Sequence, residues 1–351
     1  MYIFRLLLLA VIYFSLNSTI FTQSYSIKGQ FCASGESVED NFDIKSQLVY
    51  IPTLSLYYEL SQDRMFDLEL AYKLGRSYIG DSLVEHHEKF YRSWLRYSTK
   101  VIEARLGLQK VSFGPARVLR PLAWFDTIYP EDPTDQTEGV EAFRLRFFPS
   151  NSLTVWAWIM KGESDTLSYG GRGELSTNLG EWGFTFHKDP AKSPQLIGQY
   201  PILITGSHTR AGVDFRYDGY IGFWFESAGF FIIENQEMFD IDRHSLITMG
   251  ADYTLPIGTG LLILLETMRS EGWSSKTDES SNQTISAFMA SLPVGMFHHV
   301  MLISNLDWDK QKTYNYLRWS STYNRFSINC MLSINSSAMS NSLKLMLIYN
   351  H

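Results

Sequence analysis

The sequence predicts an all-β fold, a closed antiparallel up-and-down transmembrane β-barrel of about 18 strands. Three observations lead to this prediction. Apolar and polar residues alternate through most of the chain, no amphipathic helix of ten residues or more is recognisable, and short and long breaks follow one another in turn. A period of two residues is typical of a strand whose two faces meet different surroundings.

The composition excludes several classes of protein. Of the 351 residues, 45% are hydrophobic, 15% are aromatic and 19% are charged, whereas a typical soluble domain has about 25% charged residues. The two cysteines exclude a disulfide-stapled scaffold and a cysteine-rich metal centre. The net charge of −7 argues against a nucleic-acid partner, which would require a basic surface.

The N-terminus has the pattern of a secretory signal peptide. Arg5 precedes an apolar run over residues 6–14, and this run is too short for a membrane span, which needs about 20 residues. Thr22 and Ser24 suit cleavage after position 24, with Ser18 as an alternative site and an uncleaved anchor as an alternative interpretation. We therefore expect a cleaved signal peptide at 1–24 and a single barrel domain at 25–351.

The strand pattern is clearest at 64–74, where Phe66, Leu68 and Leu70 alternate with Asp67 and Glu69. It recurs at 101–110, 143–147, 182–187, 210–217, 326–333 and 343–349. The segments 261–268, 284–292 and 298–306 alternate poorly, so a count of about 16 strands is the alternative. Nothing in the composition marks a domain boundary.

Two classes of break separate these segments. Short breaks occur near 61–63, 98–99, 149–151, 177–178, 218–219, 256–258, 293–295 and 321–323. Long polar breaks are predicted near 35–45, 75–88, 111–138, 161–168, 188–206, 227–243, 269–283, 307–311 and 335–341. Short periplasmic turns and long extracellular loops alternate in this way in outer-membrane barrels.

A secreted β-sandwich or propeller is the competing fold, because its strands alternate as well. The apolar faces here are rich in large aromatic residues, as the girdles at two lipid interfaces require. The opposite faces carry charges of both signs in mid-strand, which suits a wet lumen. Open strand edges are excluded from lipid, so a membrane sheet must close.

One stretch resembles a known family. Arg105, Gly107 and Gln109 are followed by Gly114, a long loop, and then Gly139-Val140. This resembles the R-x-G-x-Q-x-x-x-x-G strand and the following G-V strand of Gram-negative outer-membrane porins of the alginate-export-like family, over about 45 residues. The resemblance implies a passive or substrate-preferring channel and leaves the solute undefined.

If the aromatic face meets lipid, a set of polar side chains faces the lumen. The residues predicted to line the pore are Glu103, Arg105, Gln109, Arg144, Arg146, Arg172, Glu174, Arg210, Asp214 and Arg216. Arginines concentrate in the middle strands, so we expect a transverse field across the pore. In the alternative interpretation these charges pair with neighbours and only hydrate the wall.

The segment 112–137 is the best candidate for a functional loop. It carries both signs of charge and four prolines, which restrict its conformations. We predict that it folds inward and narrows the pore; an ordinary surface loop is the alternative. The constriction residues would be Arg117, Arg120, Trp124, Asp126, Glu131, Asp132 and Asp135.

The predicted function is an outer-membrane channel for diffusion of small hydrophilic solutes. No common catalytic or metal-binding motif occurs, so we expect no enzymatic activity, no metal and no cofactor. The expected partners are outer-membrane lipid, the solutes and the outer-membrane assembly machinery, and a homo-oligomer is compatible with the sequence. The alternatives are a non-conducting barrel acting as an adhesin or docking partner, and a barrel-embedded hydrolase.

The cysteines give one further expectation. Cys32 falls in the first predicted strand and Cys330 in the penultimate one. With the last strand between them, their separation of roughly 10 Å exceeds the limit of about 7 Å between disulfide-bonded Cα atoms. We predict two free thiols, with Cys330 facing lipid.

Overall fold

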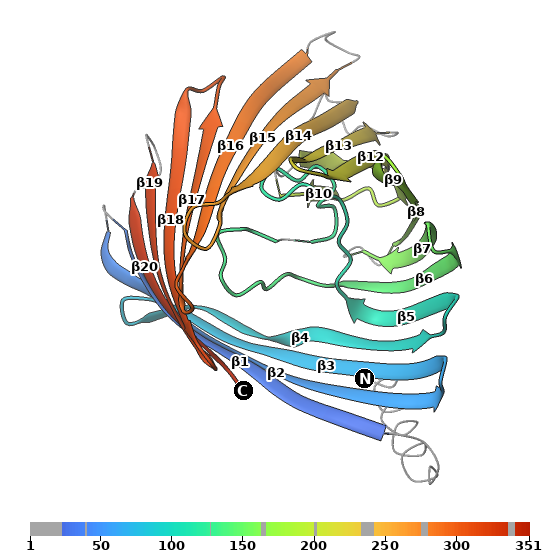
Figure 1. The fold of residues 1–351 in the computed structure, drawn as a ribbon, viewed down its shortest axis with the longest axis horizontal. Coiled ribbons are helices and arrows are strands. Elements are labelled where there is room, and N and C mark those ends of the chain that lie inside the picture. Colours follow the sequence, from blue (N-terminus) through green and yellow to red (C-terminus); the bar gives the residue numbers. More distant parts are fainter. Residues whose placement is uncertain are drawn as a thin grey trace.

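The computed structural model describes residues 23–38, 41–126, 128–162, 166–199, 202–232, 242–274, 280–335 and 341–351. An 18-stranded antiparallel sheet closes on itself, because β1 (Gln23–Val38) pairs with both β2 (Asn41–Ser61) and β20 (Ser342–Asn350) (Figure 1). This confirms the predicted fold and the count of 18 strands. The remaining barrel strands are β3 (Arg64–Ile79), β4 (Ser82–Ser98), β5 (Ile102–Gln109), β6 (Val140–Ser150), β7 (Leu153–Lys161), β8 (Leu167–Thr177), β9 (Gly180–Asp189), β12 (His208–Asp218), β13 (Gly222–Ile232), β14 (Arg243–Leu255), β15 (Leu261–Trp273), β16 (Ser280–Val294), β17 (His298–Asp307), β18 (Lys312–Tyr323) and β19 (Phe326–Asn335).

The two faces of the wall follow the alternation in the sequence. On β6 the side chains of Phe143, Leu145 and Phe147 are exposed, whereas Ala142 and Arg144 are buried toward the interior. The apolar outer face is the side that would meet lipid, and polar residues are collected inside. Among the described residues, no helix is long and apolar enough to cross a membrane.

The two rims differ in their connections. The rim that holds the N-terminal end of β1 and the C-terminal end of β20 has short connections throughout, such as 62–63, 151–152 and 324–325. The opposite rim carries the long segments 110–139 and 190–207, and the second of these contains a small hairpin of β10 (Pro194–Ile197) and β11 (Ile202–Thr205).

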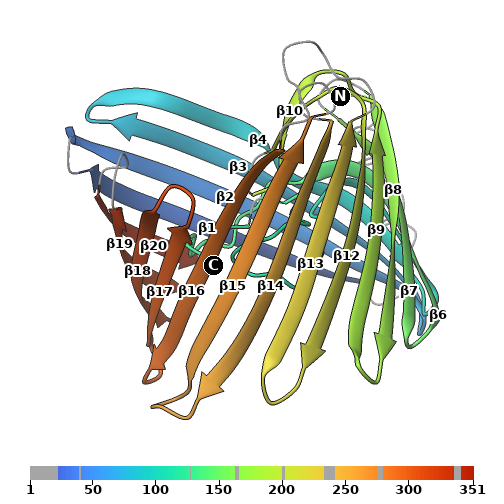
Figure 2. The ribbon, with the colours of Figure 1, turned by 90° about the horizontal axis from the view of Figure 1, so that it is seen from above.

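The long loops predicted at 35–45 and 75–88 are wrong. The strands β1 and β2 continue to Val38 and Asn41, and β3 and β4 are joined by a turn at 80–81. Figure 2 shows the β3–β4 hairpin projecting beyond the ends of β17–β20. Residues Ser82–His86 are exposed. When both faces of a β-ribbon are exposed to water, apolar and polar residues do not have to alternate along it. The polar sequence of this ribbon therefore resembles that of a loop.

Both cysteines are free, as predicted. Cys32 lies in β1 and Cys330 in β19, and β20 pairs with both strands. Cys330 shares the outward face of β19 with the exposed side chains of Phe326 and Ile328. Of the predicted signal peptide, residues 1–22 lie outside the described residues, and Gln23 and Ser24 begin β1.

Candidate functional site

The segment 110–139, here called the inner loop, leaves the end of β5 and turns into the barrel before it returns to β6 (Figure 1). Many of its apolar side chains are almost fully enclosed: Val111, Leu119 and Leu122 are no more than 1% exposed. The inner loop therefore has a hydrophobic core in common with the wall. Burial of apolar side chains on this scale is the main favourable term that holds a segment in place.

One buried carboxylate on β13 anchors the first half of the inner loop. Glu226 accepts hydrogen bonds from the backbone N–H groups of Ala116, at 3.0 Å, and Leu122. The backbone at Gly114 has a positive φ of 92°, and a Cβ there would lie 2.4 Å from the Glu226 carboxylate. Glycine is therefore required where the loop passes over this carboxylate.

A second carboxylate, Glu266 on β15, accepts three successive backbone N–H groups. These belong to Arg117, Val118 and Leu119, at 2.6–2.9 Å, and the indole of Trp224 donates a fourth hydrogen bond at 3.1 Å. Successive N–H groups that converge on an anion make a stable anchor. A buried carboxylate is costly unless such donors compensate it, so the loop and the wall stabilise each other. Glu226 and Glu266 are called the carboxylate clamp below.

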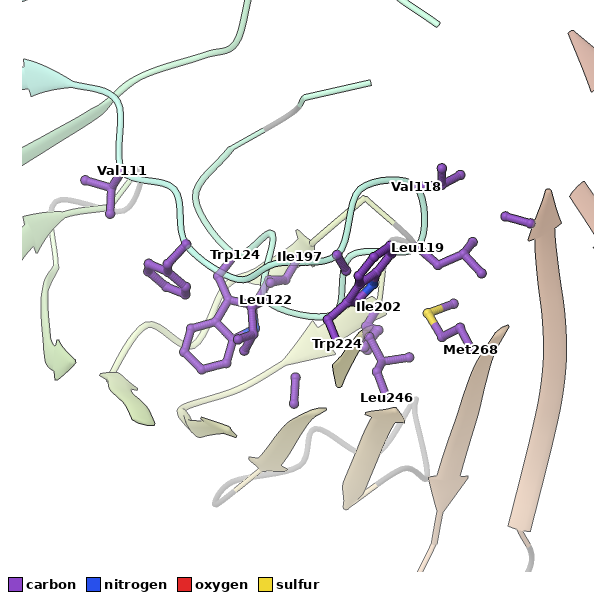
Figure 3. Packing of buried hydrophobic residues seen from close by; sticks show 14 of the residues in the cluster. Val111, Val118, Leu119, Leu122, Trp124, Ile197, Ile202, Trp224, Leu246 and Met268 are labelled. Atoms are coloured by element: carbon purple, nitrogen blue, oxygen red, sulfur yellow. The ribbon is translucent and has the colours of Figure 1, made fainter. Parts of the chain in front are cut away.

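Packing reinforces the clamp. Leu122 lies against Gly212 of β12, where a Cβ would approach the leucine Cδ2 atom to 2.3 Å. The rings of Trp124 and Phe230 lie 6.1 Å apart in an edge-to-face arrangement, which is favourable for aromatic pairs. In Figure 3, Leu119, Leu122 and Trp124 of the inner loop lie close to Trp224 and other wall side chains.

Arg117, Arg120 and Asp126 in this half of the inner loop are all paired. Arg120 binds Asp126 through both guanidinium Nη atoms, with the Nη2 bond at 2.9 Å. Both side chains, and that of Trp124, are buried. Arg117 reaches Asp252 of β14 at 3.3 Å. Three of the predicted constriction residues, Arg120, Trp124 and Asp126, therefore lie within the packed core of the loop.

The second half of the inner loop crosses to other strands and is held there mainly by side chains of the wall. The hydroxyl of Tyr316 on β18 donates to the Glu131 carbonyl, and Arg92 on β4 donates to the Thr137 carbonyl at 2.7 Å. Burial raises the pKa of the Glu131 carboxyl. The Asp132 side chain accepts the N–H of Thr134, and Asp135 has a positive φ of 53°.

Space remains on both sides of the inner loop. A cavity of about 500 Å³ separates its second half from β1, β2, β19 and β20, and Ser34, Glu131, Asp132 and Lys344 are among its lining residues. A second cavity of about 940 Å³ lies between Trp124, Phe125, the β10–β11 hairpin and Arg210. Glu131 and Asp132 border the first cavity, whereas Arg120 and Asp126 border neither.

The residues predicted to line the pore all lie on the interior face, on β5, β6, β8 and β12. Most of them form ion pairs. Glu103 bonds Arg144 at 3.0 Å and also approaches Arg105 at 3.8 Å. Arg172 bonds Asp214 at 2.6 Å. Three further members also form ion pairs: Glu174 with Arg172, Arg210 with Asp189, and Arg216 with Asp218. The last two members have other contacts: Gln109 donates a hydrogen bond to the Ala142 carbonyl, and the guanidinium of Arg146 stacks on the ring of Trp156.

The sequence reasoning missed several participants. Arg96 of β4 binds Asp67 at 2.6 Å and Glu103 at 3.3 Å. Because these two carboxylates are paired, their negative charge contributes little to the predicted transverse field across the pore. Neither Glu226 nor Glu266 is among the residues predicted above to line the pore. An isolated acid in mid-strand on the interior face is the signal that could have identified both.

The fold is similar to those of solved outer-membrane proteins. OccK2 (OpdF) of Pseudomonas aeruginosa superposes with a TM-score of 0.63 at 9% identity, covering 93% of this chain and 97% of that one. OccAB1 of Acinetobacter baumannii gives 0.62 at 9% identity over 94% and 96%. The trimer form of OmpT, an outer membrane protein of Vibrio cholerae, gives 0.53 at 12% identity over 94% and 100%. No protein-family model and no curated protein matches the sequence.

Proposed function

We propose that this chain is an outer-membrane channel for the diffusion of small hydrophilic solutes, and that the inner loop narrows its pore. The observation that carries the proposal is a closed barrel with polar residues inside, into which one anchored chain segment is folded. We infer transport rather than catalysis, export by a cleaved signal peptide, and insertion into the outer membrane by its assembly machinery. The resemblance to alginate-export-like porins over residues 105–147 belongs to the same proposal.

The solute path runs through one side of the lumen. The first half of the inner loop packs against β13–β15, whereas the second half leaves a cavity of about 500 Å³ against β1, β2, β19 and β20. Solutes would pass through this open side, between residues such as Glu131 and Asp132 on the loop and Lys344 on the wall. Asp67 and Glu103 offset part of the charge of the interior arginines of β4–β6, so we expect only a modest preference for one sign of ion.

Planar-bilayer recordings on the refolded full-length protein test the proposal. A salt gradient gives the ion preference from the reversal potential, and the proposal predicts stable stepwise openings. Heat-dependent gel mobility establishes that the barrel is folded. A folded protein that gives no openings would contradict the channel and favour a non-conducting barrel whose loops bind a partner.

A further inference from the structure

The wall of the barrel is interrupted where β4 leaves β5. Their pairing ends at Ser93↔Leu108, and β4 then continues to Ser82 paired with β3 alone among the described residues. A bulge at Tyr91 marks the point of departure, because Ala71 pairs with Arg92 and the next residue, Tyr72, pairs with Phe90. A bulge bends its strand and re-aims it. The inner loop starts just beyond β5, so no strand fills the place beside β4.

Side chains bridge this interruption in place of a backbone ladder. Arg92 donates to the Thr137 carbonyl at 2.7 Å, and Lys89 forms an ion pair with Glu138 at 3.0 Å. Unpaired backbone groups are excluded from hydrocarbon, so the free edge of β4 lies above the lipid core. The interruption therefore sits near the level of the outer-leaflet headgroups.

Below the interruption, the outer face has an apolar groove of about 670 Å³. Its lining includes outward-facing side chains of β2–β7, namely Leu54, Leu56, Leu70, Leu106, Phe143 and Ile159. The groove is continuous with the lipid-facing surface, and a void left there would forfeit the dispersion contacts of its lining atoms. In a membrane, lipid acyl chains are always adjacent to this surface, so an acyl chain is the expected occupant of the groove.

The groove also meets the lumen. Leu108, Glu141 and Lys161 line both the outer groove and the interior cavity of about 940 Å³ near Arg210. The groove thus ends in charged residues at the interruption, and the interior cavity begins at the same residues. An amphiphile with its tail in the groove would place its polar head at Glu141 and Lys161.

We propose that the groove is a specific site for the acyl chain of an outer-leaflet amphiphile, whose polar head lies at the interruption and faces the interior cavity. The site rests on the proposed outer-membrane location and gives the channel a lateral connection to the lipid. The apolar lining selects the chain, and the charged side chains of Glu141 and Lys161 accommodate the head.

Electron paramagnetic resonance of spin-labelled stearate in phosphatidylcholine vesicles tests the site. Leu106→Trp fills the groove, and Leu265→Trp on β15 is a matched control, because the two leucines are 57% and 55% exposed on the outer face. We expect a saturable immobilised signal in the wild type and in Leu265→Trp, and its loss in Leu106→Trp. A signal that fails to saturate and is the same in all three proteins would be that of ordinary boundary lipid and would overturn the proposal.

A second measurement tests the connection to the interior separately. Dodecanoate added to a bilayer with open channels should reduce the current through the wild type and Leu265→Trp, but not through Leu106→Trp. Saturable stearate binding without any change in current would contradict the lateral connection. Absence of current from every protein, with saturable binding retained, would contradict the channel and leave the acyl-chain site standing.

Discussion

The two sides of the lumen are built differently. Against β12–β15, the inner loop is attached by five backbone hydrogen bonds to Glu226 and Glu266 and by a continuous apolar core. Against β1, β2, β19 and β20, a cavity remains. The packed side fixes the position of the loop, and in the proposed channel the open side is the path left for solutes. In that proposal a single segment sets a pore dimension although it packs tightly against only part of the wall.

The largest effect is expected from removing the loop. Deletion of residues 116–134 eliminates every hydrogen bond from the loop to the carboxylate clamp, and it should raise single-channel conductance severalfold in planar bilayers. An unchanged heat-dependent gel mobility would establish that the barrel still closes. Unchanged conductance in the folded deletion variant would mean that the inner loop does not limit the pore.

The carboxylate clamp provides a sharper test, because it alters the attachment and leaves the loop sequence intact. Glu226→Ala combined with Glu266→Ala leaves buried N–H groups without acceptors, at about 1–3 kcal/mol for each. We expect noisier openings of higher mean conductance. Glu271→Ala is the control, because Glu271 lies on the same strand as Glu266 but is exposed on the opposite face and pairs with Arg269. Equal behaviour of the double variant and the control would exclude the clamp as the anchor.

Packing can be disturbed by a single methyl group. Gly212→Ala places a Cβ 2.3 Å from Leu122 Cδ2, so the loop must shift away from β12. Gly173→Ala on β8 is the control, because nothing lies within 4 Å of its Cβ position. We predict a lower melting temperature and a modest rise in conductance for Gly212→Ala alone. Identical melting of both variants would mean that this contact does not hold the loop.

The smallest effect is expected from the interior arginines. Neutralising Arg105, Arg144 and Arg146 with glutamine should move the reversal potential toward cation preference, more clearly at low salt because salt screens charges. Arg269→Gln on the outer face is the control. An unchanged reversal potential at low salt would show that these charges only pair with neighbours and hydrate the wall.

Much of the fold was predictable because a barrel repeats one physical rule at every strand. Successive residues such as Phe143 and Arg144 face opposite sides of the wall, the outside and the lumen. This alternation can be recognised from neighbouring residues in the sequence alone. The inner loop could also be singled out, since Pro115, Pro121, Pro130 and Pro133 restrict its backbone. The long β3–β4 ribbon was missed because polar strand and polar loop look alike in sequence.

The anchoring of the loop was not predictable. Glu226 and Glu266 bind backbone N–H groups, which every residue except proline has, so no side-chain pattern in the inner loop identifies its partner. The requirement for glycine at position 212 likewise could not be predicted, because it arises only from the contact with Leu122 in the folded barrel. Contacts between segments far apart in the chain depend on closure of the barrel, and the local alternation carries no information about them.

The central claim is that solutes pass on the open side of the inner loop. Single cysteines test it most directly, in a background where Cys32 and Cys330 are replaced by serine. Ser34→Cys lies in the cavity beside β1, and Ala228→Cys lies on the packed side, where Ala228 is fully buried. A charged methanethiosulfonate reagent should reduce the current through Ser34→Cys and leave Ala228→Cys unaffected. Block at Ala228→Cys with none at Ser34→Cys would contradict the account.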